Sequence, residues 1–161
     1  MAETQVRETA VPDGDAGGVP ELSVVVTLFD ERATLEELHR RLTATLEAFG
    51  RAYEILYVDD GSTDGTFATL ERIHEADMRA RAVRLKRNVG QHPAMHAGLS
   101  RIRGGIVVTM DGDLQNPPED VPRLVEAVEA GYDVASGRRA ARHDSWGRTL
   151  PSRLILSLIH I

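Results

Sequence analysis

Short runs of apolar residues alternate along the chain with longer segments in which apolar residues recur every three or four positions. The short runs predict strands over 22–28, 53–59, 82–86, 106–110 and 133–136. The longer periods predict helices from about 34 to 50, over 67–73, over 93–102 and from 117 to 131. Strands that alternate with helices in this way are typical of an α/β fold, with a mostly parallel sheet flanked by helices.

The first predicted helix has the clearest pattern. One of its faces would carry its large apolar residues, which are Leu35, Leu38, Leu42, Leu46 and Phe49. Thr34 and Glu37 have the spacing of a capping box at the start of this helix, and Gly50 suits its end. In the strand over 82–86, Arg84 interrupts the apolar run, so we expect that strand to lie near an edge of the sheet.

The length of 161 residues is that of one domain with a real core. Residues 1–20 are polar and Gly-rich and lack periodicity, so we expect a disordered tail there. The folded domain is expected over 21–150, and the apolar residues of 151–161 predict the start of an amphipathic, interfacial helix. Because cysteine is absent, any metal ion would be bound by oxygen or imidazole ligands.

The charge balance excludes some classes of partner. A formal net charge of −6 argues against a general nucleic-acid-binding protein, which needs a basic face for phosphate contacts. No apolar run approaches the roughly 20 residues that cross a bilayer, and the N-terminus does not have the layout of a secretory signal. We therefore expect a cytoplasmic location, peripheral to the cytoplasmic face of a membrane.

Basic residues gather late in the chain, at Arg138, Arg139, Arg142, Arg148 and Arg153. They could belong to a solvated linker. Their position after the fifth predicted strand and before an apolar segment also suits recognition of phosphate, which arginine binds bidentately, or of an anionic lipid surface.

Acidic residues follow three of the predicted strands, as Asp30 and Glu31, Asp59 and Asp60, and Asp111 and Asp113. Ligands of open α/β sheets bind beyond the carboxyl ends of the strands. Acids that converge there would repel one another unless a cation or hydrogen-bond donors neutralise them. This arrangement predicts Mg²⁺ or Mn²⁺ holding a diphosphate.

Three segments of the chain allow both a functional and a purely structural interpretation. Asp111 and Asp113 can face one ligand from an extended segment, with Gly112 allowing close approach to the backbone, or they can be solvated acids of a turn. Asp60 can accept hydrogen bonds from a nucleobase, whereas its neighbours at 62–64 could merely cap the next helix. The segment 88–92 could face a sugar or phosphate, or form an ordinary turn.

Taken together, these motifs resemble those of family 2 glycosyltransferases, and most of all the polyprenyl-phosphate (dolichyl- or undecaprenyl-phosphate) sugar transferases. The matching segments are VDDGSTD at 58–64, NVGQH at 88–92, DGDLQNPPE at 111–119, SGRR at 136–139 and DSWGR at 144–148. After the first strand the chain reads TLFDE at 27–31, where the family usually has Pro-x-Tyr-Asn-Glu. The resemblance implies a GT-A (Rossmann-like) fold that is incomplete at the C-terminus, because relatives continue well past this point.

The resemblance also implies roles for individual residues. Asp111 and Asp113 would be catalytic, and Asp113 with Gln115 would bind the metal. A nucleotide-diphosphate sugar, UDP- or GDP-linked, would be bound by Thr27, Phe29, Glu31, Val58, Asp60, Asp111, Gly112, Asp113 and Arg139. Arg142 and Arg148 are candidates for binding the phosphate of the polyprenyl acceptor.

The implied reaction is an inverting, metal-dependent transfer of a sugar to polyprenyl phosphate. Two alternatives remain open: a soluble glycosyltransferase acting on a sugar hydroxyl, and an inactive nucleotide-binding fragment. A dehalogenase-type phosphatase also uses D-x-D, but at its first strand. A response-regulator receiver would need a lysine after a late strand, where this chain has none.

Overall fold

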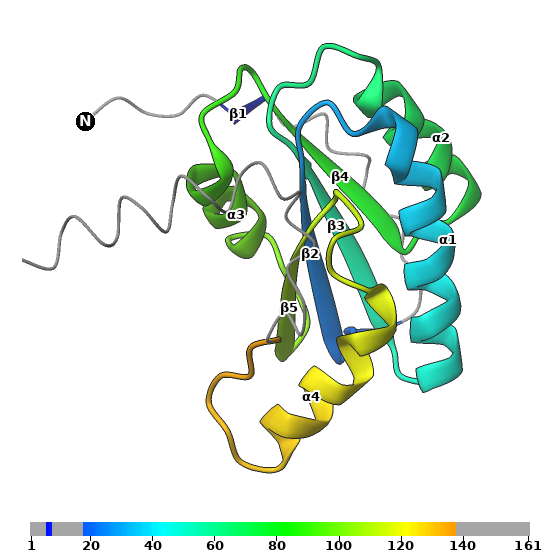
Figure 1. Ribbon diagram of the computed structural model, residues 1–161, viewed down its shortest axis with the longest axis vertical. Coiled ribbons are helices and arrows are strands. Elements are labelled where there is room, and N and C mark those ends of the chain that lie inside the picture. The colour runs from blue at the N-terminus through cyan, green and yellow to red at the C-terminus, as the bar shows by residue number, and fades with distance from the viewer. Residues whose placement is uncertain (1–5, 8–17, 138–161) are drawn as a thin grey trace, which may run out of the picture.

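A computed structural model describes residues 6–7 and 18–137, and the strands of this part form one sheet. The order across the sheet is β1-β4-β3-β2-β5 (Figure 1). The strands are β1 (Val6–Arg7), β2 (Leu22–Leu28), β3 (Tyr53–Asp59), β4 (Ala80–Leu85) and β5 (Ile106–Asp111). Strands β2 to β5 pair in parallel, and β1 pairs with β4 in the antiparallel sense.

Helices cover both faces of the sheet (Figure 1). They are α1 (Arg32–Phe49), α2 (Thr66–Ala76), α3 (Gln91–Leu99) and α4 (Val121–Glu129), with a 3-10 turn η1 (Pro118–Asp120) before α4. Apolar residues of α1, α2 and α4 share one buried cluster with the sheet, whereas Ala94 and Ala97 of α3 join a smaller cluster on the opposite face. The predicted mostly parallel α/β fold is thus confirmed.

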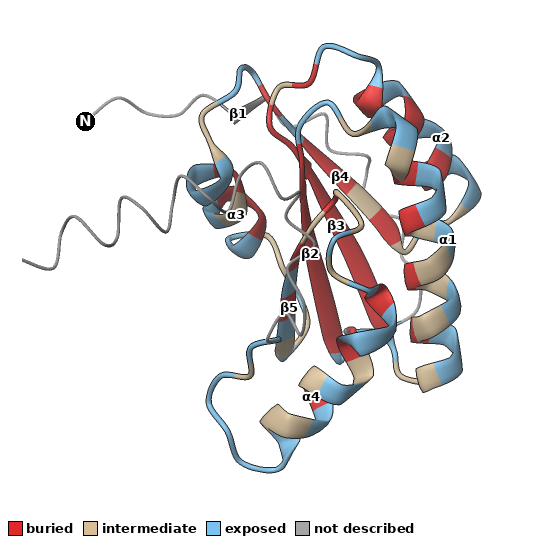
Figure 2. Cartoon of the chain, viewed as in Figure 1, coloured by how far each residue is buried: buried red, intermediate tan, exposed pale blue. Residues whose placement is uncertain are grey.

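The two central strands explain why the apolar runs are continuous. Every residue of β2 and of β3 is buried (Figure 2). Alternate side chains of a strand point to opposite faces. Accordingly, Val24 and Val26 pack in the larger cluster and Val25 packs under α3. A strand that has helices on both sides needs apolar residues at successive positions, which is the pattern seen in the sequence.

Helix α1 differs from its prediction at one end. Its four buried leucines and its end at Gly50 agree with the prediction, and Gly50 adopts a φ of 75°. The helix begins at Arg32, however, so Thr34 already lies inside it, and Glu37 bonds to Arg40 at 2.7 Å. The predicted capping box is therefore wrong, because side chains from another loop satisfy the first amides of this helix.

The prediction of a strand over 133–136 is also wrong. These residues form no strand, and Val134 is 80% exposed. The segment has one large apolar side chain, so pairing it with the sheet would bury little apolar surface.

Within the expected tail, Val6–Arg7 pair with β4, which therefore lies next to the outermost strand of the described sheet. The segment 151–161 lies outside the described residues.

A buried carboxylate joins three segments at the amino ends of the strands. Glu54 of β3 accepts hydrogen bonds from the Ser23 hydroxyl at 2.7 Å and from the Arg103 amide at 2.7 Å. The guanidinium groups of Arg81 and Arg103 each approach its other oxygen to 2.9 Å. This network lies at the opposite end of the strands from the acidic residues discussed below, so we assign it to stability.

Among the described helices, none combines the length and apolar character that a membrane crossing requires.

Candidate active site

A cavity of about 360 Å³ lies at the carboxyl ends of β2, β3 and β5 and beside the start of α3. Asp60, which directly follows β3, and Asp113, which follows β5, line this same cavity. Parallel strands bring their carboxyl ends to one edge of a sheet, so residues far apart in the sequence meet there. The full lining consists of Thr27, Leu28, Phe29, Glu31, Asp60, Asn88, Gly90, Gln91, Ala94, Asp111, Gly112 and Asp113.

Most of the expected donor-binding and metal-binding residues lie together in this lining, but Val58, expected at the donor, and Gln115, expected at the metal, do not. The Val58 side chain is fully buried and packs with Val25 under α3. Gln115 is exposed, and its backbone amide donates to Asp113 Oδ1 at 3.0 Å. The expected sites at Arg139, Arg142 and Arg148 lie outside the described residues.

Asp60 is almost fully buried, at 4% exposure, and both of its carboxylate oxygens are engaged. Oδ1 accepts a hydrogen bond from the Val89 amide at 2.8 Å, and Oδ2 accepts one from the Gly90 amide at 2.9 Å. Each carboxylate oxygen can accept a second bond. Asp60 therefore organises the loop that leads into α3, whether or not it also contacts a ligand.

Gly61 permits the close approach of that same loop. Its φ is 73°, and a Cβ atom there would lie 2.5 Å from the carbonyl carbon of Arg87. Backbone atoms cannot move away as a flexible side chain can. Glycine is therefore required at position 61 for two reasons, the positive φ and the close approach of the Arg87 backbone.

We expect Gly61→Ala to lower the free energy of unfolding by more than about 2 kcal/mol, because a left-handed conformation alone costs about 1–2 kcal/mol for a residue with Cβ. Gly50→Ala is the matched control, since Gly50 has a φ of 75° and no atom within 4 Å of its Cβ position. Urea unfolding of both variants measures the difference. Equal losses would show that the contact with Arg87 has no energetic effect.

Asp59, the residue before Asp60, has a different environment. It is fully buried, its Oδ1 accepts from the Ser62 amide at 2.9 Å, and its Oδ2 lies 3.4 Å from Arg84 Nε. The Arg84 guanidinium also lies over the Phe67 ring, 5.0 Å from its centroid. Arg84 therefore interrupts the apolar pattern of β4 because it neutralises a buried carboxylate of β3.

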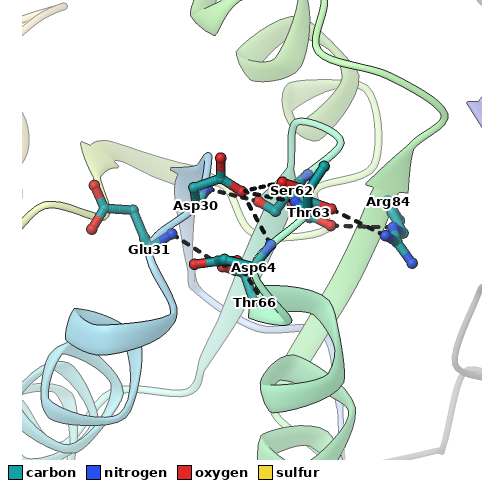
Figure 3. A network of polar contacts seen from close by, with 8 residues as sticks. Asp30, Glu31, Ser62, Thr63, Asp64, Thr66 and Arg84 are labelled. Atoms are coloured by element: carbon teal, nitrogen blue, oxygen red, sulfur yellow. Dashed lines mark hydrogen bonds and ion pairs between the residues drawn. The ribbon is translucent and has the colours of Figure 1, made fainter.

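The loop after β2 and the loop after β3 hold each other (Figure 3). Asp30, with a φ of 54°, accepts from the amides of Thr63 at 2.8 Å and Asp64 at 3.3 Å, and its own amide donates to Ser62 Oγ at 2.9 Å. A φ of this value is uncommon outside glycine and least costly for Asp and Asn. The backbone turn at Asp30 thus aims its carboxylate at the neighbouring loop.

In return, the loop after β3 caps helix α1. The Glu31 amide donates to Thr66 Oγ1 at 3.0 Å, and the Arg32 amide donates to Asp64 Oδ2 at 3.0 Å. Desolvation raises the pKa of Asp64, but hydrogen bonds from Thr66 and Arg32 outweigh it, so this pKa lies below its ordinary value. The first amides of a helix lack intrahelical partners, and here another loop supplies them.

We expect Asp30→Ala to lower the free energy of unfolding by about 1–2 kcal/mol, because it removes a cap-like acceptor and places alanine in the left-handed region. Asp30→Asn keeps an oxygen acceptor and tolerates this φ, so its loss should stay below about 0.5 kcal/mol. Thermal unfolding of the two variants compares them. A large loss in Asp30→Asn would mean that the negative charge matters instead.

The D-x-D segment is positioned by residues of two elements, β2 and α3. Asp111 Oδ1 accepts from the side-chain amide of Gln91 and lies 3.4 Å from Thr27 Oγ1. A Cβ on Gly112 would overlap the end of the Leu28 side chain and lie 3.3 Å from the Thr27 carbonyl oxygen, so a larger residue there would require Leu28 to move. This reason differs from the expected close approach of a ligand. Leu114 then turns the chain with a φ of 59°.

Thr34 lies outside the lining of the cavity but contacts two residues of that lining, and the sequence pattern did not reveal this role because the spacing of Thr34 indicated a helix cap. Its hydroxyl oxygen lies 2.7 Å from Glu31 Oε2 and 3.2 Å from the Gly112 carbonyl oxygen. It therefore links the carboxylate of the first loop to the backbone of the D-x-D segment. Only the observed start of α1, two residues earlier than Thr34, makes this role visible.

The oxygen ligands of the cavity suit a divalent cation shared with a phosphate group. Within the described part of the chain, no hydrogen bond reaches Oδ2 of Asp111 or of Asp113. The described part of the chain also contains no group of three or more histidine or acidic side chains that could enclose a metal ion. Mg²⁺ usually takes one or two carboxylates and completes its shell with water and phosphate oxygens, and this donor set fits that mode.

Comparison with known proteins identifies the family to which this fold belongs. The model of Glycosyl transferase family 2 matches residues 23–160, so the chain belongs to this family. Among curated relatives, the undecaprenyl-phosphate 4-deoxy-4-formamido-L-arabinose transferase of Edwardsiella ictaluri is 48% identical over 139 residues, 86% of this chain and 43% of that protein. Its Enterobacter counterpart is 47% identical over 142 residues, 88% of this chain and again 43% of the relative. The chain thus spans less than half of these relatives.

Solved structures agree on the fold. The mannosyltransferase PcManGT of Pyrobaculum calidifontis, in complex with GDP-Man and Mn²⁺, superposes with a TM-score of 0.55 at 25% identity, over 68% of this chain and 32% of that one. Glucosyl-3-phosphoglycerate synthase of Mycobacterium tuberculosis, with Mn²⁺, UDP and its product, gives 0.53 at 28% identity, over 71% and 40%.

Proposed function

We propose that this chain is the donor-binding part of an inverting glycosyltransferase that moves a sugar from a nucleoside-diphosphate sugar to a polyprenyl phosphate. The observation that carries the proposal is the convergence of Glu31, Asp60, Asp111 and Asp113 on one cavity at the carboxyl edge of the sheet. The names of the curated relatives support an undecaprenyl-phosphate acceptor. The nucleotides bound by structural neighbours support a UDP- or GDP-linked donor.

In the proposed reaction, an oxygen of the acceptor phosphate attacks the anomeric carbon of the sugar. The bond from that carbon to the nucleoside diphosphate breaks, its electron pair leaves with the diphosphate, and the configuration inverts. A phosphate is already ionised near neutral pH, so the chain needs no general base to activate this nucleophile, as a sugar hydroxyl would require.

The residues proposed to bind the donor and the metal divide into three roles. Glu31 and Asp60 would hold the nucleoside, Asp111 would contact the ribose or diphosphate region, and Arg139 would bind the diphosphate. Asp113, with Gln115, would hold Mg²⁺ or Mn²⁺, which when bound stabilises the negative charge of the departing nucleoside diphosphate.

For the acceptor, we propose the basic residues Arg142 and Arg148 as ligands of the lipid phosphate. A surface of anionic lipids would add about 1 kcal/mol of attraction per nearby basic residue. The protein would then work peripherally, at the cytoplasmic face of a membrane, where its lipid acceptor is anchored.

Calorimetric titration with UDP and with GDP, each with Mn²⁺ and with EDTA, tests the donor site. We expect saturable binding of one of the two nucleotides that depends on Mn²⁺. Binding of neither nucleotide by the folded chain would contradict the proposed function. Transfer assays that offer polyprenyl phosphate or a free sugar then identify the acceptor, and binding without any transfer would identify an inactive nucleotide-binding fragment.

A further inference from the structure

We propose that Gln91 is a positioning residue that fixes the orientation of Asp111, so that one carboxylate oxygen is held by the protein and the other faces the bound donor. This inference rests on the proposed function. It assigns a role to the 88–92 segment, which the sequence left open between ligand contact and an ordinary turn.

The first observation is the contact itself. Gln91 is the first residue of α3, and its Nε2 donates a hydrogen bond to Asp111 Oδ1 at the end of β5. Thr27 Oγ1, at 3.4 Å, approaches the same oxygen. No described residue donates to Oδ2, and Asp111 lines the cavity. The protein therefore occupies one side of this carboxylate and leaves the other side available.

The second observation is that the backbone around Gln91 is itself held in place. Asp60 accepts from the amides of Val89 and Gly90, and Gly61 packs against the backbone that precedes them. The start of α3 is thus tied to the end of β3, and the Gln91 side chain extends this connection to Asp111. A donor can orient a carboxylate only if the donor is itself held in place. Because the backbone before Gln91 is held, its contact with Asp111 differs from a chance contact of a surface glutamine.

The chemistry of the side chain fits this role. A carboxamide donates a hydrogen bond without adding a positive charge, so it orients Asp111 and leaves its negative charge available to a cation. A lysine or arginine at this position would neutralise that charge. Removing a group that orients a metal ligand usually changes affinity by about 10- to 100-fold, and we expect a loss of similar size for a group that orients the donor-binding carboxylate of Asp111.

A measurement without any ligand tests the contact. In the 161-residue chain, the side-chain amide resonance of Gln91 should shift in the Asp111→Ala variant and stay unchanged in His96→Ala. His96 is exposed on the same helix and does not line the cavity. An unchanged Gln91 side-chain amide resonance in the Asp111→Ala variant would overturn the proposal.

Nucleotide binding then tests the role, with Gln91→Met as the main variant because methionine keeps the length of the side chain and removes the donor. We expect it to weaken Mn²⁺-dependent nucleotide binding by about tenfold or more, with His96→Ala close to the wild type. In an Asp111→Ala background, measured by NMR titration at millimolar nucleotide, Gln91→Met should have no further effect, because Gln91 acts through Asp111.

Two results of this cycle would overturn the proposal. Wild-type affinity in Gln91→Met would show that the contact orients nothing, and a full tenfold effect in the Asp111→Ala background would show that Gln91 acts on the ligand or on folding directly. If the wild-type chain binds neither UDP nor GDP, the proposed function fails, and the amide resonance still decides whether Gln91 holds Asp111.

Discussion

Replacing Asp113 with alanine is expected to weaken Mn²⁺-dependent nucleotide binding by about 100-fold or more, which corresponds to about 2.8 kcal/mol. Asp113 lines the cavity beside Asp111, and among the described residues only the amide of Gln115 donates to it, at Oδ1. Loss of this carboxylate would remove the main proposed ligand of the cation. Calorimetry with and without Mn²⁺ measures the effect.

The control for this variant is Asp120→Ala, which removes the same charge from an exposed position of η1 outside the cavity. Its affinity should stay close to that of the wild type. If both variants lost affinity equally, a general effect of net charge would explain the result. If Asp113→Ala kept its Mn²⁺-dependent binding, the assignment of the metal site would be wrong.

Replacing Glu54 with glutamine is expected to lower the free energy of unfolding at pH 7 by about 3 kcal/mol, at the lower end of the range for a broken buried ion pair. The lower end applies because its partner Arg103 is 37% exposed and keeps contact with water. Urea unfolding measures the loss, and Glu36→Gln, which removes a carboxylate 68% exposed on α1, is the control. A loss below about 1 kcal/mol would mean that the network is mostly solvated.

The same variant should change how stability depends on pH. Burial raises the pKa of Glu54, but hydrogen bonds from Ser23, Arg103 and Arg81 outweigh it, so the folded-state pKa lies below the ordinary value of 4.5. The stabilisation is therefore complete above about pH 4.5 and is lost as the pH falls through the lower, folded-state pKa. Between pH 7 and pH 3, the free energy of unfolding should fall less steeply with pH for Glu54→Gln than for the wild type. An unchanged slope would contradict the stabilising role of the ionised Glu54 carboxylate.

The sequence predicted those parts of the fold in which burial alone decides the structure. Strands β2 and β3 are buried throughout, and the leucines of α1 face one cluster, so composition and period were sufficient. The sequence predicts a strand over 133–136, but this segment has no partner among the described strands. A local pattern cannot show whether a partner exists, because pairing is a property of the whole sheet.

The sequence predicted where the acidic residues of the candidate site lie, but it did not predict the side-chain contacts between them and other segments. Acidic residues at three strand ends indicated where the cavity would lie, because parallel strands end at one edge. The functions of Thr34 and Gln91 depend on contacts with Gly112 and Asp111, which are 78 and 20 residues away in the chain. Helical spacing explained Thr34 equally well as a cap, so only the tertiary contact separates the two interpretations.

The engagement of both Asp60 oxygens has a consequence for attempts to redesign the donor preference. A substitution at Asp60 intended to select another base would also release the amides of Val89 and Gly90, and so change the entrance of α3 together with the pocket. Libraries aimed at a new donor should instead vary Phe29 and Asn88, which line the same cavity from exposed positions and carry less of the local architecture.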